Sequence, residues 1–557
     1  MGIEQNMQQY NNIETKADDY FHILWSKIDL RHKACFFAAF AVGILTHLMM
    51  LTNKLPNWDD ISCTPGVGGG TILGRWLQQY VHGFFSVWSA PAMNGVMAIL
   101  FLSLAACFVI DIIGLRTVTA SVLTGIFFVT FPSAVSILLF MFLAPEFGLA
   151  MLLSMMGTYF ADRPLRRKNG TRAGAFASFA FGSILLMLSL ALYQSYFVLA
   201  AALLVLCCIL ECIDRCPGGE ILRHGIYRLA YLAAGMLLYL LSILIRGDSI
   251  SNYRGMNDMG SVTAREWMNA FLRDFHRVLQ YFVTSPPSFI TGFSAVLSRC
   301  VAILTAILLI AFFFTKKIYR DRMRGIFYIL LMPVQVMALG LTYIMAPTTE
   351  HGTTMMTFSY VVLYLILAAL SERIGTGCLA DPVEGAGRSV RRKVSSAAAV
   401  LAVILLVCSA YSFYRIDNMA YYRTYIASER MKAFYNRIAA RLEEQDGYDY
   451  GQKVMILRSY WPDKIPVQEQ GSGAMDYQLY DDLEGLATED KLFISNLRQC
   501  YMNLYLGVGD GAMVTQETMD KYLDDPRIAA MPSWPADGCI QKMDDIWFVK
   551  MTDKPGY

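Results

Sequence analysis

Long apolar runs constrain this chain more than any other feature of its sequence. A helix that crosses a bilayer needs about 20 mostly apolar residues. Charged residues make up only 17% of the 557-residue chain, below the roughly 25% of ordinary soluble domains. We therefore expect a polytopic α-helical membrane protein rather than a disordered chain, a coiled coil or a cytosolic enzyme. Eleven stretches could span a membrane: residues 34–51, 91–110, 117–137, 146–161, 174–192, 196–212, 229–245, 291–315, 326–346, 354–371 and 394–413.

The basic residues between these runs predict how the chain is oriented. Loops rich in Lys and Arg stay on the cytoplasmic side. With the N-terminus inside, the inner segments carry 23 Lys and Arg residues and the outer segments seven. We expect a cytoplasmic segment (1–33), a membrane catalytic domain (34–413) and an extracytoplasmic tail (414–557) of a cell-membrane protein. Residues 117–161, interrupted by prolines, could instead form one span, which would move the tail inside.

The tail differs in composition from the rest of the chain. It is polar, and two helical and two strand-like stretches alternate in it with Gly and Pro breakers: 417–445, 515–523, 454–457 and 546–551. We expect one small C-terminal α/β domain. Cys500 and Cys539 could form a disulfide there if the domain lies outside the cell. The net charge of the chain, +2, gives no basic field that would indicate a nucleic-acid partner.

The first outer loop holds the richest set of polar groups. Asp59 and Asp60 follow Trp58, and Arg75 and Trp76 come after a glycine-rich stretch. Polar groups at a membrane edge are costly and are therefore candidates for function. The simpler alternatives are a solvated helix start for the two acids and interfacial anchoring for the tryptophans.

The glycines of this loop, Gly66 and Gly68 to Gly70, do not match a nucleotide-binding loop. No Gly-Lys-Ser/Thr follows them, and Thr71 breaks the G-x-G-x-x-G register. We interpret them as a flexible turn.

Polar residues in the other outer turns form a second set of candidates. Arg246 and Arg254 could hold a lipid phosphate, or only contact headgroups. Gln194 could bond a sugar hydroxyl, or join two helices. Glu146 could be a helix-start acid, and the pair Glu350–His351 an ordinary surface pair. The substrate-binding candidates are Trp58, Arg75, Trp76, Glu146, Tyr193, Gln194, Arg246, Arg254, Glu350 and His351.

Residues 262–282 place apolar side chains at helical spacing with Arg and Asp on the opposite face. This pattern predicts an amphipathic helix at the membrane surface. The helix could act as a lid over a lipid substrate or lie passively on the membrane.

Several short motifs resemble one known family. They are Trp58-Asp59-Asp60, Gly74-Arg75-Trp76, Ser89-Ala90-Pro91, Asn94-Gly95 and Leu192-Tyr193-Gln194-Ser195. In this order, across residues 50–260, they resemble the bacterial type II glucosyltransferases, which include phage-type O-antigen glucosyltransferases.

The resemblance implies a type-C multi-span glycosyltransferase. Such an enzyme takes a sugar, here glucose, from a polyprenyl-phosphate carrier and adds it to a glycan acceptor outside the cytoplasm. It also implies that acids of the first outer loop, Asp59 and Asp60, are catalytic. The tail is longer than that of phage-type members, so the resemblance does not imply which acceptor this chain uses.

The chemistry of such a transfer suggests roles for these residues. An inverting transfer needs a base for the acceptor hydroxyl and positive charge near the departing phosphate. Asp59 or Asp60 would be the base, and the other acid could orient the acceptor or hold a divalent cation. Arg75 would neutralise the phosphate, and Trp58 or Trp76 could stack on a sugar.

Three other functions compete with this interpretation. A lipid-linked sugar flippase would need charged residues along its spans, and these spans are nearly free of charge. A polysaccharide polymerase or ligase would use the same carrier and face, and it stays open as the second choice. A scaffold that displays the tail would need only one span.

Overall fold

The computed structural model describes most of the chain, and the following account is restricted to those residues. They are residues 22–23, 25–55, 60, 73–85, 88–166, 171–247, 263–287, 289–290, 292–345, 354–377, 386–457, 491–511, 515–523 and 525–551. Five candidates and the glycine cluster lie outside the described residues: Trp58, Asp59, Arg254, Glu350, His351 and residues 66–70.

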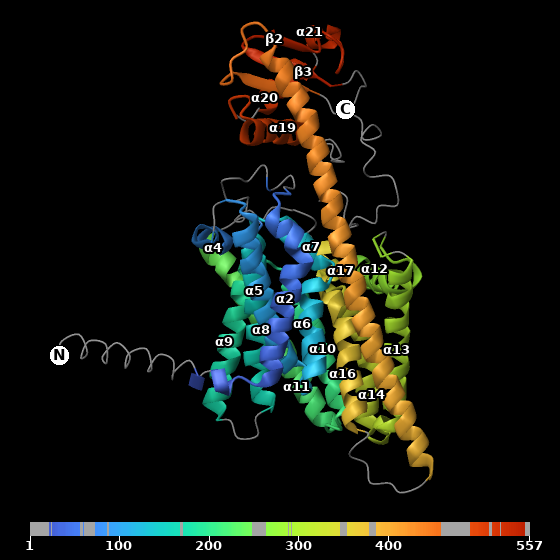
Figure 1. Cartoon of the computed structure of the whole chain (residues 1–557). Helices are drawn as coiled ribbons and strands as arrows, with labels where there is room; N and C mark the ends of the chain where they lie inside the picture. The colour runs from blue at the N-terminus through green and yellow to red at the C-terminus, as the bar shows by residue number, and fades with distance from the viewer. Residues whose placement is uncertain are drawn as a thin grey trace, which may run out of the picture.

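A bundle of long helices dominates the fold (Figure 1). Within the described ranges, nine helices are long and apolar enough to cross a membrane. They are α2 (Leu30–Thr52), α5 (Pro91–Ile112), α9 (Arg172–Leu192), α10 (Tyr196–Ile213), α11 (Gly218–Arg246), α13 (Phe293–Thr315), α14 (Arg322–Leu339), η5 with α16 (Thr354–Val361, Val362–Gly377) and α17 (Ala386–Glu443). The membrane character and mostly helical fold are thus as expected, while the count of eleven spans stays a prediction.

The interrupted stretch 117–161 forms a bent helix pair followed by a further helix. Helices α6 (Val118–Thr130) and α7 (Ser133–Leu139) meet at 46° and could together make a tenth span. Phe131 at the break is extended, as expected for a residue that precedes a proline. Ser133 then bonds the carbonyl of Thr354, which ties α7 to η5. Helix α8 (Ala144–Arg166) follows and packs between α5 and α9.

Glycines allow a close contact between α8 and α9. A Cβ added to Gly157 of α8 would lie 2.8 Å from the carbonyl oxygen of Gly182 in α9. The reverse substitution would bring a Cβ at Gly182 to 2.6 Å from the carbonyl of Gly157. Small residues at such crossings let two backbones pack directly.

Helix α17 joins the bundle to the C-terminal domain without a break. Ala402 to Tyr421 pack into the core of the bundle, and Met431 to Leu442 pack into the core of the C-terminal domain. The helix therefore passes through the expected domain boundary at residue 413. Figure 1 shows the domain beyond the end of the bundle that carries α4 (Gln78–Phe85), and α2 begins at the opposite end.

The C-terminal domain has a three-stranded sheet in the order β1-β3-β2. Strand β3 (Ile546–Lys550) pairs parallel with β1 (Lys453–Leu457) and antiparallel with β2 (Ile540–Met543). Three helices complete the described part: α19 (Lys491–Leu506), α20 (Gln516–Leu523) and α21 (Pro526–Ala530). Both expected strands are present, and β2 is an addition. Cys500 and Cys539 are free thiols, so the disulfide considered from the sequence is not formed.

The expected amphipathic helix is α12 (Ala264–Leu279), followed by the π-helical turn η3 (Gln280–Thr284). Thr263 and Glu266 close a capping box at its start, where each side chain bonds the other's backbone N–H. The helix packs on α14 and α15 (Leu341–Met345). Its Asp274 is fully buried against Gly340.

Candidate functional site

Asp60 is a buried carboxylate with a defined position. Its side chain has 0% exposure, and its Oδ1 accepts hydrogen bonds from Ser89 Oγ at 2.7 Å and from the backbone N–H of Phe142 at 3.1 Å. Lys54 Nζ lies 3.9 Å from Oδ2. A solvated helix-start acid would be exposed, so that simpler interpretation is wrong for Asp60.

Lys54 and Ser89 complete a small polar network around this acid. Lys54 Nζ donates to Ser89 Oγ at 2.5 Å, and Ser89 in turn donates to Asp60. Burial lowers the pKa of Lys54, and the charge of Asp60 partly opposes that effect. Sequence reasoning missed both residues as site members, although Ser89 lies in one of the family-like motifs.

Arg75 is positioned by two residues of the turn between α9 and α10. Its Nε donates to Gln194 Oε1 at 3.1 Å, and its guanidinium lies 4.9 Å above the ring of Tyr193. Gln194 Nε2 donates to the carbonyl of Leu73 at 2.8 Å and to Tyr239 Oη at 2.9 Å. The amide of Gln194 therefore holds the first loop against α11, and its bond to a sugar hydroxyl stays a prediction. Tyr239 was not identified from the sequence.

Trp76 and Arg246 form a second contact between the loop and α11. Trp76 Nε1 donates to Ser242 Oγ at 2.9 Å, and the Arg246 guanidinium lies 5.3 Å from the centre of the Trp76 ring. Arg246 also donates to Tyr80 Oη at 3.3 Å. These contacts place an exposed arginine beside aromatic rings at the edge of the bundle.

Glu146 pairs with a residue that the sequence did not single out. Its Oε1 lies 2.9 Å from His82 Nδ1, and both side chains have 0% exposure. The remaining atoms, Glu146 Oε2 and His82 Nε2, are buried and have no hydrogen-bond partner among the residues described. The only sequence signal for His82 was a lone imidazole in the aromatic stretch that becomes α4.

Aromatic side chains connect the polar groups described above. The ring of Phe142, whose N–H bonds Asp60, lies 6.5 Å from the His82 ring. Phe147, next to Glu146, lies 4.7 Å from the ring of Tyr193, over which Arg75 lies. Asp60, the His82–Glu146 pair and Arg75 therefore occupy one continuous region at one end of the bundle.

The charge of Asp60 acts on a tyrosine of the C-terminal domain. Burial raises the pKa of Tyr505, on α19, and the negative charge of Asp60 raises this pKa further. Its ring stacks on that of Tyr501 at 4.9 Å. Tyr505 was not a candidate from the sequence, because nothing in the tail singled it out.

A metal site was also considered from the sequence. Among the described residues, no group of three or more His, Cys, Asp or Glu side chains could hold a metal ion. Since Asp59 lies outside those residues, a divalent cation on the adjacent acids stays a prediction.

Comparison with known proteins identifies one family. The profile of the family described as Glucosyl transferase GtrII matches residues 48–370, which is more than half of the chain. The matched region contains Asp60, Arg75, His82, Glu146 and Gln194. No curated protein and no solved structure matches the chain significantly.

Proposed function

The chain belongs to the glucosyl transferase GtrII family, and on this premise we propose that it transfers glucose from a polyprenyl-phosphate carrier to a surface glycan. The observation that carries the proposal is the buried Asp60, held by Ser89, Phe142 and Lys54 in the same region as Arg75. The reaction takes place at the extracytoplasmic face of the cell membrane, which is the side with few basic loops.

The transfer is an inverting displacement. The acceptor oxygen forms a bond to sugar C1 while the bond from C1 to the carrier phosphate oxygen breaks. Asp60 accepts the proton of the acceptor hydroxyl, and the polyprenyl phosphate leaves with the electron pair. Ser89 and Phe142 fix the carboxylate through Oδ1, and Lys54 stabilises its negative charge. Asp59 orients the acceptor or holds a cation.

The leaving phosphate needs positive charge where its own charge develops. Arg75 is the best placed of the described arginines, because Gln194 and Tyr193 fix the plane of its guanidinium. A guanidinium presents a planar fork of donors that matches a phosphate. Arg246 lies farther along the same edge, beside Trp76 and Tyr80, where it contacts the carrier phosphate or a flanking headgroup.

Analysis of the cell-surface glycan tests the proposed function. Its sugar composition and linkages are compared with and without this gene, and after complementation with Asp59→Asn, Asp60→Asn or Asp446→Asn. Asp446 is exposed in the C-terminal domain and controls for the same change of charge. We expect loss of one glucose branch in the deletion, no rescue by at least one of the two loop variants, and full rescue by Asp446→Asn.

Other outcomes would assign a different role. Loss of the whole polymer in the deletion strain would indicate a polymerase or flippase. Full activity of both loop variants, at normal protein levels, would remove the two acids from the mechanism.

A further inference from the structure

Asn94 is a buried amide in the first turn of α5, with 1% exposure. Its Nδ2 donates to the carbonyl of Met141 at 2.9 Å and to the carbonyl of Trp88 at 3.1 Å. Because both of these groups are acceptors, Nδ2 rather than Oδ1 has to face them. Oδ1 is buried without a hydrogen-bond partner among the described residues. The amide therefore acts here through its donor group.

One of these carbonyls is directly linked to Asp60. The carbonyl of Met141 and the N–H of Phe142 belong to the same peptide group, and that N–H donates to Asp60 Oδ1 at 3.1 Å. Asn94, the peptide group and the carboxylate therefore form a chain of two hydrogen bonds. Hydrogen bonds in a chain polarise one another. Donation from Asn94 to the carbonyl thus makes the N–H at the other end of the peptide group a stronger donor to Asp60.

The second carbonyl lies beside the other partner of Asp60. Trp88 directly precedes Ser89, whose hydroxyl donates to the same carboxylate oxygen at 2.7 Å. The backbone N–H of Asn94 also donates to the carbonyl of Ala90 at 2.9 Å. Asn94 therefore bonds the residue on each side of Ser89, through its side chain on one side and its backbone on the other.

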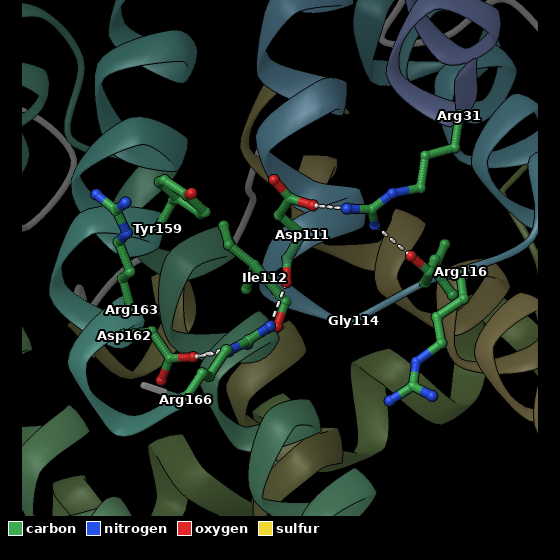
Figure 2. A pocket seen from close by; sticks show the side chains of 10 residues that line it. Arg31, Asp111, Ile112, Gly114, Arg116, Tyr159, Asp162, Arg163 and Arg166 are labelled. Carbon is green, nitrogen blue, oxygen red and sulfur yellow. Dashed lines mark hydrogen bonds and ion pairs between the residues drawn. The ribbon is translucent and has the colours of Figure 1, made fainter. Parts of the chain in front are cut away.

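Helix α5, which carries Asn94, is also held at its far end (Figure 2). Asp111, in the last turn, forms an ion pair with Arg31 of α2 at 2.7 Å. Arg166 of α8 donates to the carbonyls of Asp111 and Ile112. Because contacts hold both ends of the helix, Asn94 has a defined position relative to the two segments that it bonds.

We propose that Asn94 is a positioning residue of the sugar transfer, which fixes Asp60 through the peptide group of Phe142 and through Ser89. This inference rests on the proposed function, in which Asp60 accepts the proton of the acceptor hydroxyl. Stronger hydrogen bonds to a carboxylate favour its charged form, and fixed donors keep it in the geometry that proton transfer requires. Since Asn94 acts through Asp60, loss of its amide should change kcat rather than donor KM.

Kinetics of two Asn94 variants test this role, with purified full-length protein, synthetic polyprenyl-phosphate glucose and surface glycan from the deletion strain. Asn94→Leu has a similar volume and no donor, and it should lower kcat about tenfold with donor KM nearly unchanged. Asn94→Asp keeps the shape of the side chain but offers at most one donor, so its kcat should also fall. The Tm of each variant in detergent shows that it is folded.

The pH profile of kcat gives a second readout. Its acidic limb should move to higher pH in both variants, because the carboxylate of Asp60 is less stabilised there. The titratable groups described around Asp60 are Lys54, at 3.9 Å, and Tyr505. Both are unchanged in the Asn94 variants, so they do not account for a shift of the profile.

Ser103→Ala is the matched control in the same helix. Ser103 is buried, and its hydroxyl donates to the carbonyl of Ile99 at 2.7 Å. This variant should keep the kcat, the donor KM and the pH profile of the wild type. A folded Asn94 variant whose kcat and pH profile equal those of Ser103→Ala would overturn the proposal. A rise in donor KM at constant kcat would overturn it as well.

Asp60→Asn, assayed in parallel, distinguishes failure of this proposal from failure of the proposed function. If Asp60→Asn is inactive and the folded Asn94 variants are fully active, only the positioning role of Asn94 is wrong. If Asp60→Asn is fully active, Asp60 is not the base and the role of Asn94 falls with it.

Discussion

His82 Nδ1 and Glu146 Oε1 lie 2.9 Å apart with neither side chain exposed, so one polar contact fastens the short helix α4 to the start of α8. Breaking a buried pair leaves one polar group without a partner, which is costlier than replacing both. We expect Glu146→Met and His82→Leu each to destabilise the protein by about 3 kcal/mol. The double change His82→Leu/Glu146→Met should recover most of the loss. Thermal unfolding of all three variants in detergent measures this.

The same variants show whether the His82–Glu146 pair only stabilises the fold or also takes part in the reaction. If the pair only fastens α4, the double variant should transfer sugar at a near-normal rate once its stability is recovered. A stable double variant without activity would instead place the pair in the reaction.

Lys54 and Ser89 are predicted to position Asp60 rather than to bind the sugar donor. Ser89→Ala removes one hydrogen bond to a charged group and should lower kcat about tenfold or more, with donor KM nearly unchanged. Lys54→Met should have a larger effect, and Lys54→Arg should restore part of the rate. Steady-state kinetics with a synthetic polyprenyl-phosphate glucose measures kcat and donor KM for each variant. A rise in donor KM with constant kcat would contradict the positioning role.

The two arginines of the first-loop region are predicted to differ in their importance for donor phosphate. Arg75→Ala should weaken inhibition by a soluble phosphonate analogue of the donor about tenfold, because a charge-assisted contact is lost. Arg246→Ala should have a smaller effect, since Arg246 is exposed and contacts aromatic rings. Inhibition that is unchanged in both variants would exclude them from the phosphate site. Arg254→Ala extends the series to the third arginine candidate.

The stability of the protein should fall between about pH 4 and pH 7 because of Asp274. Burial raises the pKa of Asp274 from 3.8 to about 7, and Arg277 partly opposes this shift. In that pH range the unfolded state loses a proton that the folded state keeps, so unfolding becomes easier as the pH rises. Asp274→Asn should be more stable than the wild type by on the order of 2 kcal/mol at pH 8, with little difference at pH 4. Thermal unfolding of the wild type and of Asp274→Asn at pH 4 and pH 8 measures which protein is more stable at each pH.

Tyr505 is predicted to act on the acceptor side of the transfer. Tyr505→Ala should raise the KM for the acceptor several-fold while donor KM stays unchanged, since the charge of Asp60 acts on Tyr505 and an aromatic ring can stack on a sugar. Tyr505→Phe keeps the ring and should behave as the wild type. Leu504→Ala, a neighbouring change on α19 at a partly exposed position, is the matched control. Equal kinetics of Tyr505→Ala and Leu504→Ala would contradict the prediction.

Hydropathy predicted the helices of the bundle well, because each run has to match the thickness of a membrane by itself. It could not predict the polar pairs. Glu146 and His82 are 64 positions apart, and Asp60 and Phe142 are 82 apart. Such contacts depend on how helices cross, which a single sequence does not encode locally.

The boundary at residue 413 shows a second limit of the sequence. Polarity rises at this position, but no Gly or Pro occurs from residue 388 to residue 443. Without a breaker the helix continues, and α17 enters the C-terminal domain intact. Polarity marks where a chain leaves a membrane, whereas breakers mark where a helix stops.

Because α17 is continuous, its length sets the distance between the bundle and the C-terminal domain. From Tyr421, whose hydroxyl bonds His47 in the bundle, to Leu442 in the core of the C-terminal domain, the helix covers 21 residue steps or ~32 Å. Each residue inserted there would raise the domain by ~1.5 Å and turn it by ~100° about the helix axis. The height and heading of the C-terminal domain above the bundle are therefore set by the number of residues in one helix.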